Sequence, residues 1–201
     1  MGSRRSRNLP LMYYEFGTGS GNTLQRAIAS LRHHPGSGAV LFDSFEGLPE
    51  PKHAADKGVL WQEGQFAYSQ DYIRSVIRMA GFPLDRVRFV PGFFEKSLTP
   101  ELRAELSETP PAFVTIDVDF YYSTVEVLTW IAPLLASGTL FFFDDLHAYD
   151  CHPDYGQLRA LNEFNRDNHE GQLVPHPSLG NRVYVYYRQN YEVGARDLPA
   201  A

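Results

Sequence analysis

Short apolar runs alternate along this chain with segments whose apolar residues recur every three or four positions. The runs have the length of β-strands, and the recurring pattern is typical of helices with one buried face. Strands and helices that alternate in this way form a mainly parallel sheet with helices on both faces. The pattern therefore predicts an α/β fold of the doubly wound, Rossmann-like type. The expected parallel strands are Leu11–Phe16, Ala39–Phe42, Val87–Val90, Ala112–Asp117 and Thr139–Phe143.

Segments with the helical pattern lie between these strands, and two of them begin with recognisable signals. Thr99 and Pro100 provide an N-cap and a proline at the first helical position. Ser123 and Glu126 have the spacing of a capping box, so we expect another helix to begin there. The expected apolar faces consist of Leu24, Ala27, Ile28 and Leu31, then Ile73, Val76, Ile77 and Ala80, then Val127, Leu128, Ile131 and Leu134, and finally Leu158, Leu161 and Phe164.

The last two expected strands pair in an antiparallel manner, unlike the five before them. Leu173–Val174 and Arg182–Tyr187 suit an antiparallel pair joined through "SLGN", and "VYVYY" suggests an edge strand with its tyrosines on the exposed side. The expected sheet therefore has seven strands, mostly parallel, with an antiparallel C-terminal edge pair. A chain of 201 residues with 43% hydrophobic content is enough for one domain, which we expect to span residues 1–201 after a flexible tail at 1–10.

One connection is too long for a compact domain of this kind. Gly47–Ser69 has no strand or helix pattern of its own, and connections of this length are usually functional loops or disordered insertions. It contains Trp61 and Phe66, whereas disordered segments tend to lack aromatic residues. We therefore expect residues 47–69 to form a lid, with a passive surface loop as the alternative.

Charge and cysteine content exclude several classes of function. The formal net charge of −6 argues against nucleic acid as a partner, because phosphate binding relies on clustered Lys and Arg. No segment of the sequence is long and apolar enough to span a membrane, and the N-terminus lacks the apolar region of a signal peptide. Cys151 is the only cysteine, which excludes an internal disulfide and a cysteine-built zinc site. We expect a soluble, cytoplasmic protein.

The first strand leads into a glycine-rich turn, "EFGTGSGN". Glycines allow a tight turn and let a ligand approach the main chain. A dinucleotide fingerprint would need a third glycine at Asn22, and a phosphate-binding Walker loop would need a lysine. The observed pattern, with Glu15 before Gly17, Gly19 and Gly21, instead resembles the nucleoside-binding turn of class I methyltransferases. Their ligand, S-adenosylmethionine, carries a sulfonium and an ammonium group, which suits an acidic residue.

Asp43, at the end of the second strand, lies where a ribose diol would be held in such a fold. A purely structural strand–helix turn remains the alternative for the glycines alone. The combination of the turn, Asp43 and the parallel pattern favours a site for S-adenosylmethionine.

Two pairs of aspartates follow core strands. Asp117 and Asp119 end the fourth strand, and Asp144 and Asp145 end the fifth. Ligands bind at the carboxyl ends of parallel strands, and adjacent carboxylates would repel each other and raise each other's pKa values. A divalent cation with oxygen ligands would relieve this repulsion, and the lack of cysteine ligands favours Mg²⁺ over zinc.

These acids suggest a chemistry. A cation held by Asp117, Asp144 and Asp145 would hold a substrate hydroxyl and lower its pKa. Asp119, expected by strand periodicity to point the same way, could take the proton. For each aspartate alone, capping or solvent exposure is the alternative. His147, in the loop that follows, is either a substrate-binding group or, as we favour, an exposed loop histidine.

The same stretches resemble a known family. "YEFGTGSGNT", "LFDSFEGLPEP", "FVTIDVDFYYST" and "FFFDD" are similar, in order and spacing, to segments of the macrocin O-methyltransferase family, whose members are metal-dependent class I enzymes. Several members methylate sugar hydroxyls in antibiotic biosynthesis. The likeness runs from about Tyr14 to Phe164. It implies an O-methyltransferase that acts on a hydroxyl of a small metabolite, sugar or phenol-like, with Mg²⁺ or another divalent cation.

The resemblance also implies roles for individual residues. Asp117, Asp144 and Asp145 would bind the metal, and Asp119 would be the general base. Family members usually carry helices ahead of the first strand that close the substrate site and form oligomers, and here about ten residues precede it. A homo-oligomer is therefore an expectation from the family alone. The implied cofactor contacts are Glu15, Gly17, Gly19, Gly21, Asp43, Ser44, Phe45, Gly92 and Phe93.

Two other functions fit parts of the pattern. A catalytically inactive S-adenosylmethionine-binding module would bind the nucleoside and methylate no hydroxyl. A metal-dependent hydrolase could use the four aspartates but would leave the glycine turn and Asp43 unexplained.

Overall fold

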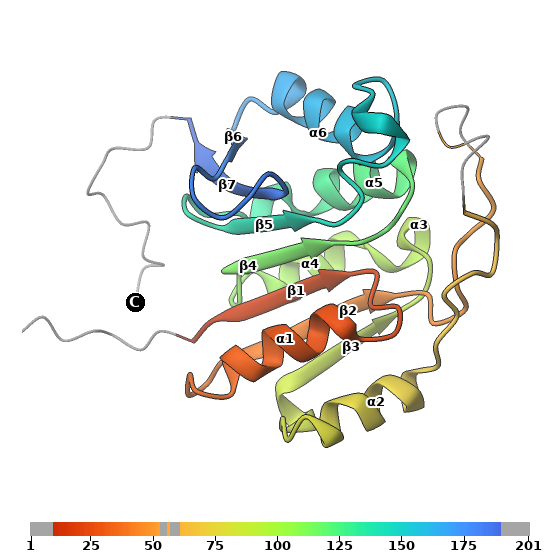
Figure 1. Cartoon of the computed structure of the whole chain (residues 1–201). Coiled ribbons are helices and arrows are strands. Elements are labelled where there is room, and N and C mark those ends of the chain that lie inside the picture. The colour runs from red at the N-terminus through yellow and green to blue at the C-terminus, as the bar shows by residue number, and fades with distance from the viewer. Residues whose placement is uncertain (1–9, 53–55, 57–60, 190–201) are drawn as a thin grey trace, which may run out of the picture.

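The strands form one sheet whose order places the ends of β1, β4 and β5 side by side. The computed structural model describes residues 10–52, 56 and 61–189. The sheet has seven strands in the order β3-β2-β1-β4-β5-β7-β6 (Figure 1). Its first five members pair in parallel, and β7 runs antiparallel to both β5 and β6. The strands are β1 (Met12–Phe16), β2 (Gly38–Asp43), β3 (Val87–Pro91), β4 (Phe113–Ile116), β5 (Leu140–Phe143), β6 (Gly171–Pro175) and β7 (Val183–Arg188).

Helices lie on both faces of this sheet, as the alternating pattern predicts. Apolar side chains of α1 and α2 pack with β1, β2 and β3 on one face. Side chains of α4, α5 and α6 pack on the other face. The helices are α1 (Asn22–Leu31), α2 (Gln70–Met79), α3 (Phe94–Ser97), α4 (Pro100–Leu106), α5 (Tyr121–Ile131) and α6 (Gly156–Asp167), with 3₁₀ turns η2 (Leu84–Arg86), η3 (Ala132–Leu134) and η4 (Tyr149–Cys151).

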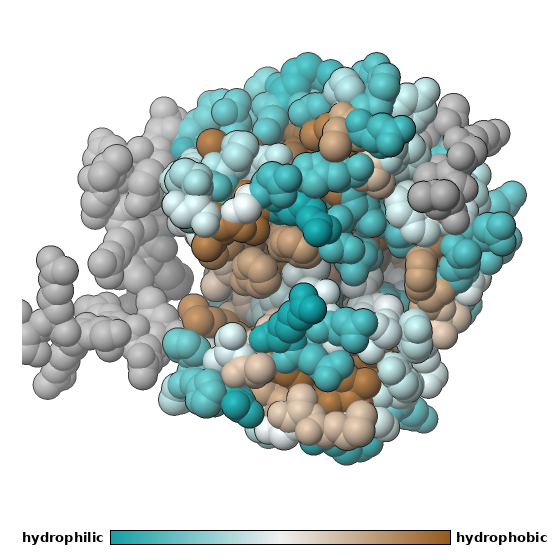
Figure 2. Space-filling model, viewed as in Figure 1, coloured by the Kyte–Doolittle hydropathy of each residue, from teal (hydrophilic) through white to brown (hydrophobic). Residues whose placement is uncertain are grey.

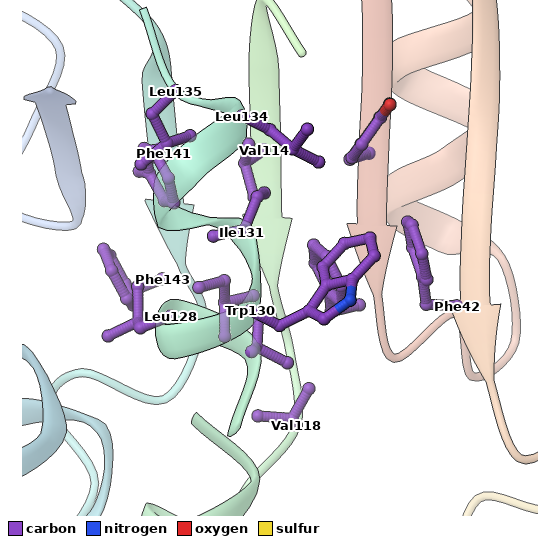
Figure 3. Close-up of a cluster of buried hydrophobic side chains, with 14 of the residues drawn as sticks. Phe42, Val114, Val118, Leu128, Trp130, Ile131, Leu134, Leu135, Phe141 and Phe143 are labelled. Atoms are coloured by element: carbon purple, nitrogen blue, oxygen red, sulfur yellow. The ribbon is translucent and has the colours of Figure 1, made fainter. Parts of the chain in front are cut away.

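The larger core lies between α5 and the central strands. The indole of Trp130 lies edge-on to the ring of Phe42, with 5.5 Å between ring centroids (Figure 3). Its Nε1–H donates to the carbonyl of Thr99, 2.8 Å away, at the N-terminus of α4. This contact buries the one polar group of the indole with a partner, as a core tryptophan requires. Val114 and Ile131 lie in the same region of the core and are fully buried (Figure 3).

Most predictions about the helices and strands are confirmed, but the capping box at Ser123 and the edge position of the last strand are wrong. Thr99 caps α4 by accepting a hydrogen bond from the N–H of Leu102. The capping box at Ser123 does not form, because α5 begins two residues earlier at Tyr121 and buries Ser123 within its first turn. The predicted edge strand β7 lies inside the sheet, since β6 forms the edge, and the side chain of Tyr186 is fully buried.

The surface is mostly hydrophilic, with smaller apolar areas between the polar side chains (Figure 2). One apolar area lies over β4 and β5, where no helix among the described residues covers that face of the sheet (Figures 1 and 2). None of the helices in the described ranges is long and apolar enough to cross a membrane. Most of the predicted N-terminal tail, residues 1–9, lies outside the described residues.

Candidate functional site

The two aspartate pairs meet because β4 and β5 are neighbours in parallel register. Ile116 pairs with Phe143, so the residues that follow each strand emerge at the same edge of the sheet. One carboxylate oxygen from each of Asp117, Asp144 and Asp145 lies within 4.8 Å of the others. The structure therefore brings together the three residues that the sequence predicts as metal ligands.

Asp119 reaches the same cavity by a different route from the predicted one. The strand ends at Ile116, and Asp119 adopts a left-handed backbone with φ 62°. This turn, and not strand periodicity, directs the residue toward the cavity, which its side chain lines. The N–H of Asp119 donates to Oδ2 of Asp145 at 3.1 Å. A left-handed conformation is costly for a residue with a side chain, so the surrounding contacts must hold it in place.

Burial and mutual repulsion dominate the electrostatics of this cluster. Burial, followed by the charge of Asp145, raises the pKa of Asp117 to about 8 and that of Asp119 to about 8. The pKa of Asp145 rises to about 6, mainly through burial and then through the charge of Asp144. Arg182 offsets part of the charge, because its guanidinium lies 3.0 Å from Oδ1 of Asp144. A bound cation would favour the ionised form of all these groups.

Gln157 is a neighbour of the acidic cluster that the sequence does not reveal. Its side chain is fully buried at the start of α6. Its Oε1 accepts from the N–H of Asp145 at 2.9 Å. Its Nε2 donates to the carbonyl of Ile116 at 3.1 Å and to Oδ2 of Asp145 at 3.3 Å. The amide thus ties the ends of β4 and β5 together and orients one candidate ligand.

The glycine-rich turn passes directly over the end of β4. Gly17 has φ 78°, and a Cβ atom there would lie 1.7 Å from the carbonyl oxygen of Asp117. Only glycine allows this approach. Asp43 holds the turn: its Oδ2 accepts from the N–H of Thr18 at 2.6 Å and of Gly19 at 3.3 Å, and its Oδ1 accepts from the N–H of Phe45 at 2.7 Å.

A cavity of about 660 Å³ joins the turn to the acidic cluster. Besides Asp119 and the three candidate metal ligands, six of the predicted cofactor contacts line it: Gly17, Gly19, Asp43, Ser44, Gly92 and Phe93.

Three predicted contacts do not line this cavity. Glu15 is fully buried within the sheet, and burial raises its carboxyl pKa well above the usual range. Gly21 lies behind the turn, where a Cβ would be 3.3 Å from a methyl group of Val76. Phe45 lines an adjoining surface hollow instead. Sequence position alone cannot separate a residue that touches a ligand from one that supports the turn.

The 47–69 loop, as far as it is described, forms one wall of the cavity. Its two arms pair at their base, where the N–H of Leu48 donates to the carbonyl of Gln65 at 2.8 Å and the N–H of Gly64 donates to the carbonyl of Leu48 at 2.8 Å. Trp61 lines the cavity and packs edge-on against Phe120, 6.5 Å between centroids. Residues 53–55 and 57–60 lie outside the described part of the loop, so its role as a lid stays a prediction.

His147 does not belong to the cavity wall. It lies in an exposed loop, and its Nδ1 is 3.5 Å from the sulfur of the exposed Cys151. This placement agrees with the interpretation of an exposed loop histidine.

Comparison with solved structures shows the class to which this arrangement belongs. A calicheamicin methyltransferase matches with a TM-score of 0.69 and 26% identity over 92% of this chain and 74% of its own. The O-methyltransferase NovP matches with a TM-score of 0.67 and 24% identity, over 90% of this chain and 73% of its own, and that likeness shows the fold alone. The fold is that of class I methyltransferases, as predicted.

The sequence identifies the family. The profile of the macrocin-O-methyltransferase (TylF) family matches residues 17–170, and this chain belongs to that family. A relative in Streptomyces olivaceus, the 8-demethyl-8-(2,3-dimethoxy-alpha-L-rhamnosyl)-tetracenomycin-C 4'-O-methyltransferase, is 30% identical over 132 residues, which cover 63% of this chain. The matched region is 49% of that relative, so it spans about half the relative's length.

Proposed function

We propose that this protein is an S-adenosylmethionine-dependent O-methyltransferase that uses a divalent cation, Mg²⁺ being the best fit. Its substrate is a hydroxyl of a small sugar-bearing or phenol-like metabolite of the kind made in natural-product biosynthesis. The observation that carries this proposal is the shared cavity, in which the glycine turn with Asp43 faces three converging carboxylates and Asp119. Membership of the macrocin-O-methyltransferase family supports it.

The turn fits the nucleoside ligand. Thr18 lines the cavity. Its side-chain hydroxyl is buried and has no hydrogen-bond partner among the described residues. A buried hydroxyl without a partner is unfavourable, so a polar group of a ligand would stabilise it. Asp43 uses part of its acceptor capacity on backbone N–H groups, and the rest is available to ribose hydroxyls. Glu15 would act from behind the turn and not by contact.

The acidic cluster fits a hard divalent cation. Carboxylate oxygens are the ligands that Mg²⁺ prefers, and Asp117, Asp144 and Asp145 would hold it. When bound, such an ion lowers the pKa of a hydroxyl that it ligates, while S-adenosylmethionine supplies a methyl group on a sulfonium. Gln157 orients Asp145 through the hydrogen bonds described above, in the manner of a supporting residue at a metal site.

Asp119 is the proposed general base. It lines the cavity beside the three carboxylates, is almost completely buried, and is fixed by its N–H bond to Asp145. A carboxylate in this position could accept the proton of an acceptor hydroxyl held by the site. Trp61, which also lines the cavity, would exclude water and pack against the acceptor.

The test is methyl transfer from isotopically labelled S-adenosylmethionine to a panel of neutral sugar and phenol acceptors, with EDTA or with added Mg²⁺. We expect transfer to at least one acceptor, loss of transfer in EDTA, and recovery with Mg²⁺. Transfer that persists at full rate in EDTA would remove the cation from the mechanism. Tight S-adenosylhomocysteine binding without transfer to any acceptor would favour the inactive binding module.

A further inference from the structure

Helix α5 starts immediately after the Asp119 turn, and its N-terminus lacks a cap of its own. Its N-cap residue is Phe120, which has no polar side-chain atom, and no side-chain capping bond forms there. The first N–H groups of a helix have no partner within the helix and need one from elsewhere. In α5 they include the N–H groups of Tyr121 and Tyr122, next to the acidic cluster.

The missing cap comes from the 47–69 loop. The Oδ1 of Asp56 accepts from the N–H of Tyr121 at 2.6 Å, and its Oδ2 accepts from the N–H of Tyr122 at 3.4 Å. Asp56 is only 1% exposed. A buried carboxylate is costly unless it is well bonded, and the two N–H bonds at the positive end of the helix dipole contribute to the compensation. Loop and helix are therefore joined by a charge-assisted contact across 65 positions of sequence.

This contact lies close to the proposed base. The segment from Val118 to Tyr122 is held at both ends. At one end the N–H of Asp119 donates to Asp145, and at the other the N–H groups of α5 donate to Asp56. Between them, the N–H of Phe120 closes a tight turn onto the carbonyl of Val118 at 2.6 Å. The ring of Phe120 also touches Trp61.

We propose that Asp56 is a positioning residue of the site. By capping α5 it fixes the left-handed turn that directs Asp119 into the cavity, and it seats Trp61 of the same loop against Phe120. Asp56 itself does not line the cavity, so it acts through these residues and not by touching the substrate. The catalytic consequence rests on the proposed role of Asp119, whereas the structural coupling does not.

The first test needs no variant. Residue-resolved hydrogen exchange on the whole chain should show the amides of Tyr121 and Tyr122 protected to the level of the interior of α5. The reference for an uncapped helix start is the exchange rate in the first turn of α1, whose N-cap residue Gly21 provides no side-chain hydrogen bond. Exchange of both tyrosine amides as fast as in that uncapped turn would overturn the proposal, even if Asp56 variants fail to fold.

The second test compares Asp56→Ala with Thr99→Ala, which removes a cap of the same kind from α4. Trp130 is buried in the core, so acrylamide quenching reports mainly Trp61. We expect Asp56→Ala, and not Thr99→Ala, to increase that quenching at least twofold and to speed exchange at Tyr121. Asp56→Asn, which keeps an acceptor oxygen, should recover most of both signals. Equal effects of the two alanine variants would contradict the proposal.

A third readout separates this inference from the proposed function. On an acceptor that the wild type methylates, Asp56→Ala should lower kcat about tenfold or more and leave the Kd of S-adenosylhomocysteine within about twofold, because the turn at Gly17 is not touched. Asp56→Asn should recover kcat. If the wild type methylates nothing, the proposed function fails, while the exchange and quenching results still decide the role of Asp56.

Discussion

Replacing Gln157 by leucine would remove the three hydrogen bonds of a fully buried side chain with little change in side-chain volume. The N–H of Asp145 would then be left without its partner. The carbonyl of Ile116 would lose one of its two donors and keep the N–H of Asp144 at 3.0 Å. Each buried polar group that loses its partner costs about 1–3 kcal/mol. Because Asp145 also loses a donor to its Oδ2, we expect the free energy of unfolding to fall by roughly 2–4 kcal/mol.

Loss of the Gln157 hydrogen bonds should lower both the thermal stability and the affinity for Mg²⁺. For a chain of this length, 1 kcal/mol corresponds to about 2–4 °C in Tm, so the midpoint should fall by roughly 5–15 °C. Without its supporting amide, the Asp145 carboxylate is less well oriented, and loss of such support typically weakens metal affinity by about 10–100-fold. Thermal unfolding of the metal-free protein measures the first effect, and calorimetric titration with Mg²⁺ measures the second.

Gln172→Leu is the matched control. Gln172 is exposed, and its side chain makes only a long 3.5 Å contact with the carbonyl of Asn165. It should change Tm by less than about 2 °C, as expected for an exposed substitution, and should leave Mg²⁺ affinity unchanged. A Gln157→Leu protein that behaves like this control would refute the supporting role of Gln157 at the acidic cluster.

Three further predictions concern the proposed chemistry. Asp119→Asn should keep S-adenosylhomocysteine binding and lower kcat by about 10²–10⁴-fold, as measured by labelled methyl transfer, and an unchanged kcat would reject Asp119 as the base. Gly17→Ala should weaken S-adenosylhomocysteine at least about tenfold by calorimetry, since its methyl group would overlap the Asp117 carbonyl, and wild-type affinity would contradict the close approach. Nine acidic side chains and two lysines line the cavity. This negative charge should repel the phosphates of a nucleoside diphosphate sugar. A neutral glycoside should therefore be methylated with at least about tenfold higher kcat/KM than the same sugar carried on a nucleoside diphosphate, and the reverse preference would contradict this electrostatic selection.

The fold could be predicted because it depends on periodic features that are local in the sequence. Strand-length apolar runs, helical faces and the Thr99 cap are each readable within a few residues, and all were confirmed. The convergence of Asp117 with Asp144 and Asp145 was also predictable, since it requires only that two parallel strands be neighbours. Such features need no knowledge of side-chain packing.

The parts that the sequence did not reveal depend on long-range packing. Gln157 fits an ordinary helical pattern, and nothing local marks its amide as the link between two strand ends. Asp56 caps a helix that lies far along the chain, and this external cap leaves Ser123 free to lie inside α5 instead of starting it. The burial of Glu15 depends on how closely the sheet packs beneath the turn.

The most direct test of the proposed site is thermal unfolding of chelator-treated protein with S-adenosylhomocysteine, Mg²⁺, both or neither. A ligand that binds only the folded state at 100 times its Kd stabilises it by about 2.7 kcal/mol, or roughly 5–10 °C here. We predict a rise with the nucleoside that Mg²⁺ enlarges, with the Mg²⁺ increment absent from Asp144→Ala and retained in Asp150→Ala, an exposed acid outside the cavity. No rise with saturating nucleoside would contradict the assignment of the glycine turn, and with it the proposed methyltransferase.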